Sequence, residues 1–229
     1  MNYKYLVRAV MQKCSIVIWF GLIFISTALS DTQFEDDGFW DDSTAEVNEG
    51  ALEFLTIPPS KPVHHHQNII RIKSSSLQDG WVELAQCHHH LDQVPRLEIV
   101  YNPQRIRSLQ VVSSRNIGFA EVVGAKLSLR EVGAAAEICM TAESRALHSL
   151  GSGLFQLRNG PYMRRFLDGY YPMKLTLEVQ YPTTKLMFHK QRPLPEEHVV
   201  KRRSNGVYKW SGWFTGKLST EIDFKLLNQ

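Results

Sequence analysis

Apolar and polar residues alternate along residues 173–181, MKLTLEVQY, and almost as regularly along residues 218–226, LSTEIDFKL. Successive side chains of a β-strand point to opposite faces of a sheet. Each stretch therefore predicts a strand that buries one face and exposes the other to water, a pattern typical of antiparallel sheets. The same pattern argues against helices here, because the apolar positions of a helix recur every three or four residues.

Shorter stretches of strand-like composition run through the rest of the chain, separated by turn residues. The clearest turn is Asn205-Gly206, a pair that favours a tight hairpin. We therefore expect residues 67–229 to form a single domain of the mainly β class, an antiparallel β-sandwich that is immunoglobulin-like or jelly-roll-like. The expected shorter strands are residues 68–73, 81–87, 96–101, 106–113, 117–123, 126–131, 137–142, 185–189 and 207–215.

One short helix is expected in the segment RNGPYMRRFLDGYYP. Asn159-Gly160 breaks the preceding strand, Pro161 is compatible with a first helical turn, and Asp168-Gly169 would end the helix. Tyr162 and Phe166 would then lie one turn apart and cover one end of the sheet.

The first thirty residues have the composition of a cleavable export signal. Basic residues without any acidic one precede an uncharged, largely apolar run at positions 14–30, which ends in the small residues Ala28 and Ser30. A retained membrane anchor would need about 20 apolar residues, more than this run supplies. We expect residues 1–30 to be a signal peptide cleaved after Ser30, and the mature protein to be periplasmic or secreted, without a transmembrane span.

Residues 31–66 are expected to form a disordered tail or linker that contains acidic residues, prolines and histidines. Positions 31–53 hold nine acidic residues and no basic one, whereas the rest of the mature chain is basic. Low hydrophobicity and like charge oppose the folding of such a segment. Two interpretations remain open: a solvated spacer, or an arm that docks on the basic domain.

Only two cysteines, Cys87 and Cys139, follow the expected cleavage site. An even pair in an oxidising compartment most simply forms one disulfide. By strand alternation Cys87 shares a face with Glu83, and Cys139 shares one with Glu137, which is the more polar face of each predicted strand. We therefore expect a disulfide between neighbouring strands rather than one that crosses the core.

Three consecutive histidines follow Cys87, and the side chains of His88 and His90 would project to the same side of an extended chain. Two such imidazoles, with His148 as a third ligand, predict a site for zinc or copper. Otherwise no cofactor is expected, and the alternative interpretation is that these histidines are solvated loop residues. Further candidate ligands are Asp92, His189, His198 and the mobile cluster of residues 64–66.

Two groups of basic residues are candidates for contact with an anion or a partner. Arg164 and Arg165 lie among tyrosines in the segment expected to be helical, and Lys201, Arg202 and Arg203 precede the predicted hairpin turn. For the first group, the alternative is that the aromatic residues of this segment pack against the core and leave the two arginines exposed without a ligand. For the second group, the alternative is a solvated sheet edge whose charges discourage strand pairing. As partners we expect an envelope protein or an anionic surface component. Nucleic acid is not an expected partner, because export removes the protein from it.

The sequence lacks the local motifs of several enzyme classes, including G-x-S-x-G, S-x-x-K, H-E-x-x-H, C-x-x-C and G-x-G-x-x-G. We therefore expect an exported, non-catalytic binding or accessory protein of the cell envelope, whose ligand the sequence does not identify. Two alternatives remain: a metal-binding protein that uses His88 and His90, and a hydrolase whose active-site residues are dispersed over several strands.

Overall fold

The computed structural model describes residues 50–166, 168–193 and 200–227, without the side chains of residues 200–202. The expected signal peptide and the first part of the expected tail, up to residue 49, lie outside the described residues. Within the described part of the chain, no helix is long and apolar enough to cross a membrane.

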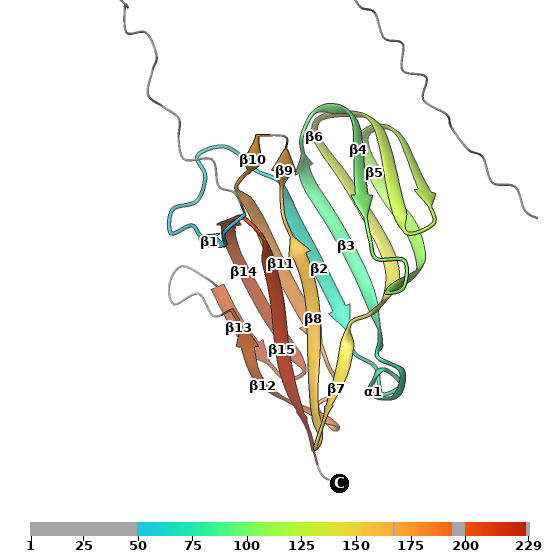
Figure 1. Cartoon of the computed structure of the whole chain (residues 1–229), viewed down its shortest axis with the longest axis vertical. Helices are drawn as coiled ribbons and strands as arrows, with labels where there is room; N and C mark the ends of the chain where they lie inside the picture. Colours follow the sequence, from blue (N-terminus) through green and yellow to red (C-terminus); the bar gives the residue numbers. More distant parts are fainter. Residues whose placement is uncertain (1–49, 167, 194–199, 228–229) are drawn as a thin grey trace, which may run out of the picture. The chain divides into compact units, whose positions relative to one another are not determined.

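β-Strands dominate the described residues, which confirms the prediction of a mainly β protein (Figure 1). A nine-stranded sheet has the order β1-β14-β11-β2-β3-β6-β4, with β13 also paired to β14 and β5 to β6. A four-stranded sheet has the order β12-β15-β8-β7, and β9 pairs with β10. Every pairing within these sheets is antiparallel except that of β2 with β11, which is parallel.

The elements have the following bounds: β1 Glu53–Phe54, β2 His65–Arg71, α1 Ser76–Asp79, β3 Trp81–Leu91, β4 Val94–Val100, β5 Ile106–Val123, β6 Lys126–Arg145, β7 Leu147–Gly151, β8 Leu154–Tyr162, β9 Arg165–Phe166, β10 Gly169–Tyr170, β11 Met173–Gln180, β12 Leu186–Arg192, β13 Val200–Ser204, β14 Val207–Thr215 and β15 Leu218–Leu226.

The two larger sheets contribute side chains to one apolar core. Leu175 and Leu177 of β11 are fully buried, as the alternation predicts, and so are Ile222 and Phe224 of β15. All four belong to a single cluster of buried apolar residues drawn from both sheets. We call the face of the nine-stranded sheet that enters this core its inner face and the opposite, solvated face its outer face.

The hairpin of β5 and β6 folds back on itself. Tyr101 N donates to Ala125 O beside one end of β6, while Arg145 N at the other end donates to Arg105 O. Residues 101 and 105 are separated by at most about 14 Å of chain, whereas a straight strand of the length of β6 would span about 65 Å. The strand must therefore curve strongly, as Figure 1 shows at the top of β6.

Folding of this hairpin creates a second apolar core. Leu127 and Leu129 in the first half of β6 and Ile138 and Met140 in its second half are all buried in one cluster. Close to the bend, Asn116 and the facing strand's Ala135 have φ values of 56° and 50°, a left-handed conformation that Asn tolerates better than most residues. Shorter predicted strands at 117–123, 126–131 and 137–142 are thus halves of two long, bent strands.

The prediction of a short helix from Pro161 onward is wrong. Pro161 and Tyr162 end β8, where Tyr162 pairs with Leu218 of β15. Pairing of this segment with a neighbouring strand overrides the local helical signals, because the ladder satisfies backbone groups that a short helix would leave unpaired. The helix of the described chain is α1, a single turn elsewhere.

The ordered strands begin earlier than the expected domain boundary at residue 67. Glu53–Phe54 forms β1 on the edge of β14, and β2 begins at His65. His64 also joins the sheet, because its backbone oxygen accepts a hydrogen bond from Lys174 N at 2.9 Å. The histidines at 64–66, which the sequence places in the linker, therefore belong to the sheet.

Candidate functional site

A disulfide joins Cys87 of β3 to Cys139 of β6, as the sequence predicts. The two residues are direct cross-strand neighbours in the ladder. Both side chains lie on the outer face, where Gln67 of β2 and Ser113 of β5 continue the same row. The bond therefore ties two central strands together without entering either apolar core.

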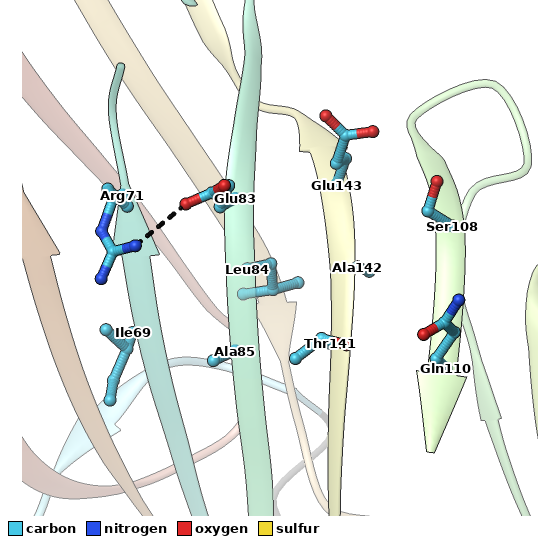
Figure 2. A pocket seen from close by; sticks show the side chains of 10 residues that line it. All are labelled: Ile69, Arg71, Glu83, Leu84, Ala85, Ser108, Gln110, Thr141, Ala142 and Glu143. Atoms are coloured by element: carbon cyan, nitrogen blue, oxygen red, sulfur yellow. Dashed lines mark hydrogen bonds and ion pairs between the residues drawn. The ribbon is translucent and has the colours of Figure 1, made fainter. Parts of the chain in front are cut away.

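Next to the disulfide, the outer face is hollowed by a groove of about 420 Å³. Ile69, Ala85 and Thr141 are register partners on β2, β3 and β6, and Gln110 of β5 faces Thr141. Figure 2 shows the short side chains of Ala85 and Thr141 between longer neighbours. The groove forms because these small residues lie in the middle of a row of larger ones. We call it the outer groove, and it is lined by Ile69, Arg71, Glu83, Leu84, Ala85, Ser108, Gln110, Thr141, Ala142 and Glu143.

A charged row borders the outer groove on one side. Arg71 Nη1 lies 3.2 Å from Glu83 Oε2, the pair drawn in Figure 2, and Arg107 Nε lies 2.9 Å from Glu143 Oε2. Lys73 also pairs with Glu83. The hydrogen bond from Lys73 is the main cause that lowers the pKa of the Glu83 carboxyl. That carboxylate is therefore ionised at neutral pH and acts as a hydrogen-bond acceptor.

The outer groove offers donors and acceptors but no arrangement for covalent catalysis. Its lining contains neither His nor Cys, so its one serine, Ser108, has no imidazole in the groove to act as its base. A nucleophilic serine needs a general base within hydrogen-bond reach. The lowered pKa of Glu83 is the opposite of what a general acid needs, and Glu143 is engaged in an ion pair with Arg107.

The opposite face of the same strands carries His64, which is half-buried, and His66 and His88, which are buried. We call these three residues the histidine cluster. His64 Nε2 and His88 Nδ1 share a hydrogen bond of 2.9 Å. The ring centroids of His66 and His88 are 4.4 Å apart, and those of His64 and His88 are 5.1 Å apart. His66 and His88 are 7% and 3% exposed, so water has little access to them.

Amide and phenol groups surround the histidine cluster. His66 Nε2 lies 2.8 Å from Asn68 Oδ1, and Asn68 Nδ2 donates to the Tyr162 hydroxyl at 2.8 Å. Gln86 contacts His66 through its amide nitrogen and accepts from the Tyr101 hydroxyl at 2.8 Å. This network satisfies several polar groups that would be costly to bury alone, but Nε2 of His88 is buried without a hydrogen-bond partner among the described residues.

The network lies between the two apolar cores. Along the inner face of β3, Leu84 belongs to the first core, Gln86 and His88 form the polar part, and Leu91 belongs to the second core. The order of residues along one strand thus places a polar partition where the folded hairpin meets the rest of the protein.

Burial keeps the histidine cluster neutral. Desolvation lowers the pKa of His64 to about 4, against a smaller opposing effect of Asp92. Desolvation also lowers the pKa of His66 to about 3, and it lowers that of His88 well below the ordinary value. Near pH 7 these rings therefore interact as uncharged donors and acceptors.

The structure does not bring together the three histidines expected to bind a metal. His88 is buried, whereas His90 is exposed with a φ of 53°, because the ladder of β3 is interrupted between His88 and Leu91. His148 lies on β7, opposite Gln156. Among the described residues, no group of three or more His, Cys, Asp or Glu side chains is arranged to hold a metal ion. Binding of zinc or copper stays a prediction.

The basic residues expected to contact an anion have different environments. Arg164 forms a two-pronged ion pair with Asp92, at 2.5 and 2.9 Å, and is therefore occupied. Arg165 lies over the Tyr170 ring at 5.6 Å, and Arg203 lies over the Phe188 ring at 5.7 Å. Lys201 and Arg202 belong to β13, but their side chains lie outside the described part of the structure.

Sequence reasoning missed the outer groove, and it placed His64 and His66 in a mobile linker, as further candidate ligands, rather than on the sheet beside His88. The position of these histidines could have been predicted from strand alternation. Every second residue faces inward in β2, namely His66, Asn68 and Ile70, so the predicted strand at 68–73 begins earlier, near the histidines. The groove had no local signal, because its lining comes from four strands. Comparison with known protein families and with curated proteins finds no match to this chain.

Proposed function

We propose that the protein is an exported, non-catalytic binding protein whose ligand site is the outer groove. The observation that carries this proposal is a hollow of about 420 Å³ with polar groups around a floor of small side chains. Sites for small molecules have volumes of this order and combine apolar surface with a few oriented polar groups.

The charges around the outer groove favour an uncharged polar or zwitterionic ligand. Across the four strands the carboxylates of Glu83 and Glu143 are neighbours, with Arg71 on one side and Arg107 on the other. Each carboxylate is paired with the adjacent guanidinium group. A ligand with one net charge would have to separate such a pair, whereas one with both donors and acceptors would not. Sugar units and short peptides have this chemistry.

The disulfide supports the proposed destination. Disulfides persist in oxidising compartments such as the periplasm and the extracellular space, and the bond between Cys87 and Cys139 joins adjacent strands without a catalytic arrangement. Periplasmic or secreted location, an accessory role in the cell envelope and the finer assignment as an immunoglobulin-like or jelly-roll-like β-sandwich are parts of this proposal.

Isothermal titration calorimetry with a panel of neutral sugars and dipeptides tests the proposal. We expect at least one member to bind the wild type and to lose binding in Ala85→Trp, which fills the floor of the groove. Ser219→Trp adds the same ring at an exposed position on β15 and should bind like the wild type. Binding that Ala85→Trp does not change, or no binding by any member, would refute the outer groove as the site.

A further inference from the structure

Three arginines meet at the junction of β6 and β7. Arg145 N donates to Arg105 O at 3.0 Å, and Arg105 Nε donates to Arg145 O at 3.4 Å. Arg158 N donates to the oxygen of the adjacent Ala146 at 2.9 Å. The backbone thus gathers Arg105, Arg145 and Arg158, called here the arginine cluster, from three different strands or their flanks.

The arginine cluster lacks acidic partners. All three residues are exposed, and none forms an ion pair with a carboxylate of the described residues. Arg158 Nε donates to Gln156 Oε1 at 2.5 Å, and its register partner on β15, Glu221, is paired with Arg192 instead.

The arginines of the adjoining strand β5 differ in this respect: Arg107 is paired with Glu143, and Arg115 with Glu137. This difference between paired and unpaired arginines matters, because unpaired like charges repel one another and a bound anion stabilises them.

His148 lies close enough to the arginine cluster for all three charges to affect its titration. Its pKa is lowered first by desolvation and then by the charges of Arg158, Arg105 and Arg145. His148 faces Gln156 in the ladder of β7 and β8, and its Nε2 atom is buried without a hydrogen-bond partner in the described structure. A neutral imidazole leaves the guanidinium groups as the source of positive charge.

The carboxylate of Asp79 is directed elsewhere. Its Oδ1 atom accepts a hydrogen bond from Trp81 N at 3.0 Å. Trp81 also stacks with the Arg107 guanidinium, whose carbon lies 4.1 Å from the ring centroid. Arg107 is in turn paired with Glu143, so this group of residues stands beside the arginine cluster without neutralising it.

We propose that Arg105, Arg145 and Arg158 bind a phosphate group. Planar guanidinium groups donate paired hydrogen bonds that match the oxygens of phosphate, and several of them together compensate its multiple charge. The phosphate group belongs to a soluble ligand or to a lipid headgroup, and the chemistry at the cluster is the same for both. This proposal is independent of the outer groove, whose lining contains none of the three arginines.

The first arm of the test is calorimetric titration of the full chain with inorganic phosphate at low ionic strength and pH 7.5. We expect Arg105→Ala, Arg145→Ala and Arg158→Ala each to weaken binding about tenfold, as loss of one charge-assisted contact predicts. Arg115→Ala removes the same charge from β5 at a paired position and should bind like the wild type. Thermal unfolding of each variant verifies that it is folded.

The second arm measures cosedimentation with phosphatidylcholine vesicles that contain or lack phosphatidylglycerol. Binding of free phosphate that depends on the arginine cluster identifies a soluble source, and cluster-dependent binding to the anionic vesicles alone identifies a headgroup. The proposal is overturned if neither probe binds, or if Arg145→Ala and Arg115→Ala bind both probes equally well. Glu83→Gln, which alters the outer groove, should leave either result unchanged.

Discussion

The histidine cluster and the outer groove are built on opposite faces of β2 and β3, yet their polar groups are arranged differently. His66 and His88 face inward with neutral partners and almost no exposure. Arg71 and Glu83 face outward as a charged pair with 59% and 38% exposed side chains. Buried polar groups depend on each other for hydrogen bonds, whereas exposed ones can exchange a partner for water or a ligand. The inner face is thus suited to hold the fold and the outer face to bind.

Acidification should produce the largest difference between the two faces. The folded state favours neutral His64, so the unfolded chain binds the proton first as pH falls below about 6.5. Stability is complete above that pH and is lost progressively toward pH 4, the folded-state pKa of His64. The loss from His64 alone should reach about 3 kcal/mol, and His66 and His88, whose pKa values are also lowered, add to it. Urea unfolding at several pH values measures the total.

Matched substitutions assign this pH dependence to the inner face. His64→Gln removes the titrating group, so its unfolding free energy should fall less between pH 7 and pH 4.5 than that of the wild type. His89→Gln removes a histidine on the outer face, beside Glu137, and should retain the slope of the wild type. Equal slopes in the wild type and both variants would contradict the role given to the histidine cluster.

Loss of the disulfide should have the next largest effect. It closes a loop with a sequence separation of 52 residues, for which chain entropy predicts a stabilisation of about 4 kcal/mol. The double substitution of Cys87 and Cys139 by Ala should lower the free energy of unfolding by this order. Because the bond lies on the outer face, the acid sensitivity should persist in the variant. If the free energy of unfolding of this variant did not change with pH, the disulfide and the histidine cluster would be coupled, contrary to this expectation.

Removal of one hydroxyl from the inner network should cost less. Tyr162→Phe leaves Asn68 Nδ2 without its acceptor in a buried position, which predicts a loss of about 1 to 3 kcal/mol. Thr176→Val removes a hydroxyl that contacts His65 and Ser211 on the outer face. Water can replace that contact, so we expect a smaller loss in the same unfolding measurement. A larger loss for Thr176→Val would reverse the comparison.

The smallest effect on stability is expected in the outer groove. Glu83→Gln breaks exposed ion pairs with Arg71 and Lys73, and such pairs contribute at most about 1 kcal/mol. The variant should unfold almost like the wild type but bind the ligand of the groove more weakly. A loss of several kcal/mol would show that this charged row stabilises the fold rather than a ligand complex.

Much of the fold could be predicted from the alternation of residues, because burial of one face imposes a period of two. The parity of Cys87 and Cys139 likewise predicted a disulfide on the outer face. The bend of β6 could not be predicted in this way, since curvature depends on pairing with β4 on one side and β5 on the other. The segment around Pro161 was misinterpreted because its local helical signals are weaker than its pairing with β15.

The candidate sites depended on tertiary pairing, which the sequence reveals only in part. His88 was recognised as important, but its partners His64 and His66 lie on another strand and its expected partner His90 turns away at an interruption of the ladder. The outer groove joins four strands from distant parts of the sequence. A pattern along one strand can assign a face, but it cannot identify which residues meet across a sheet.

Native mass spectrometry of the protein, purified from its own cells without denaturation, tests the central claim most directly. If the outer groove is the ligand site, the wild type should carry a bound small molecule that is absent from Ala85→Trp and present in Ser219→Trp. The account is contradicted if the bound mass is the same in all three proteins, or if the wild type carries no ligand under conditions in which it remains folded.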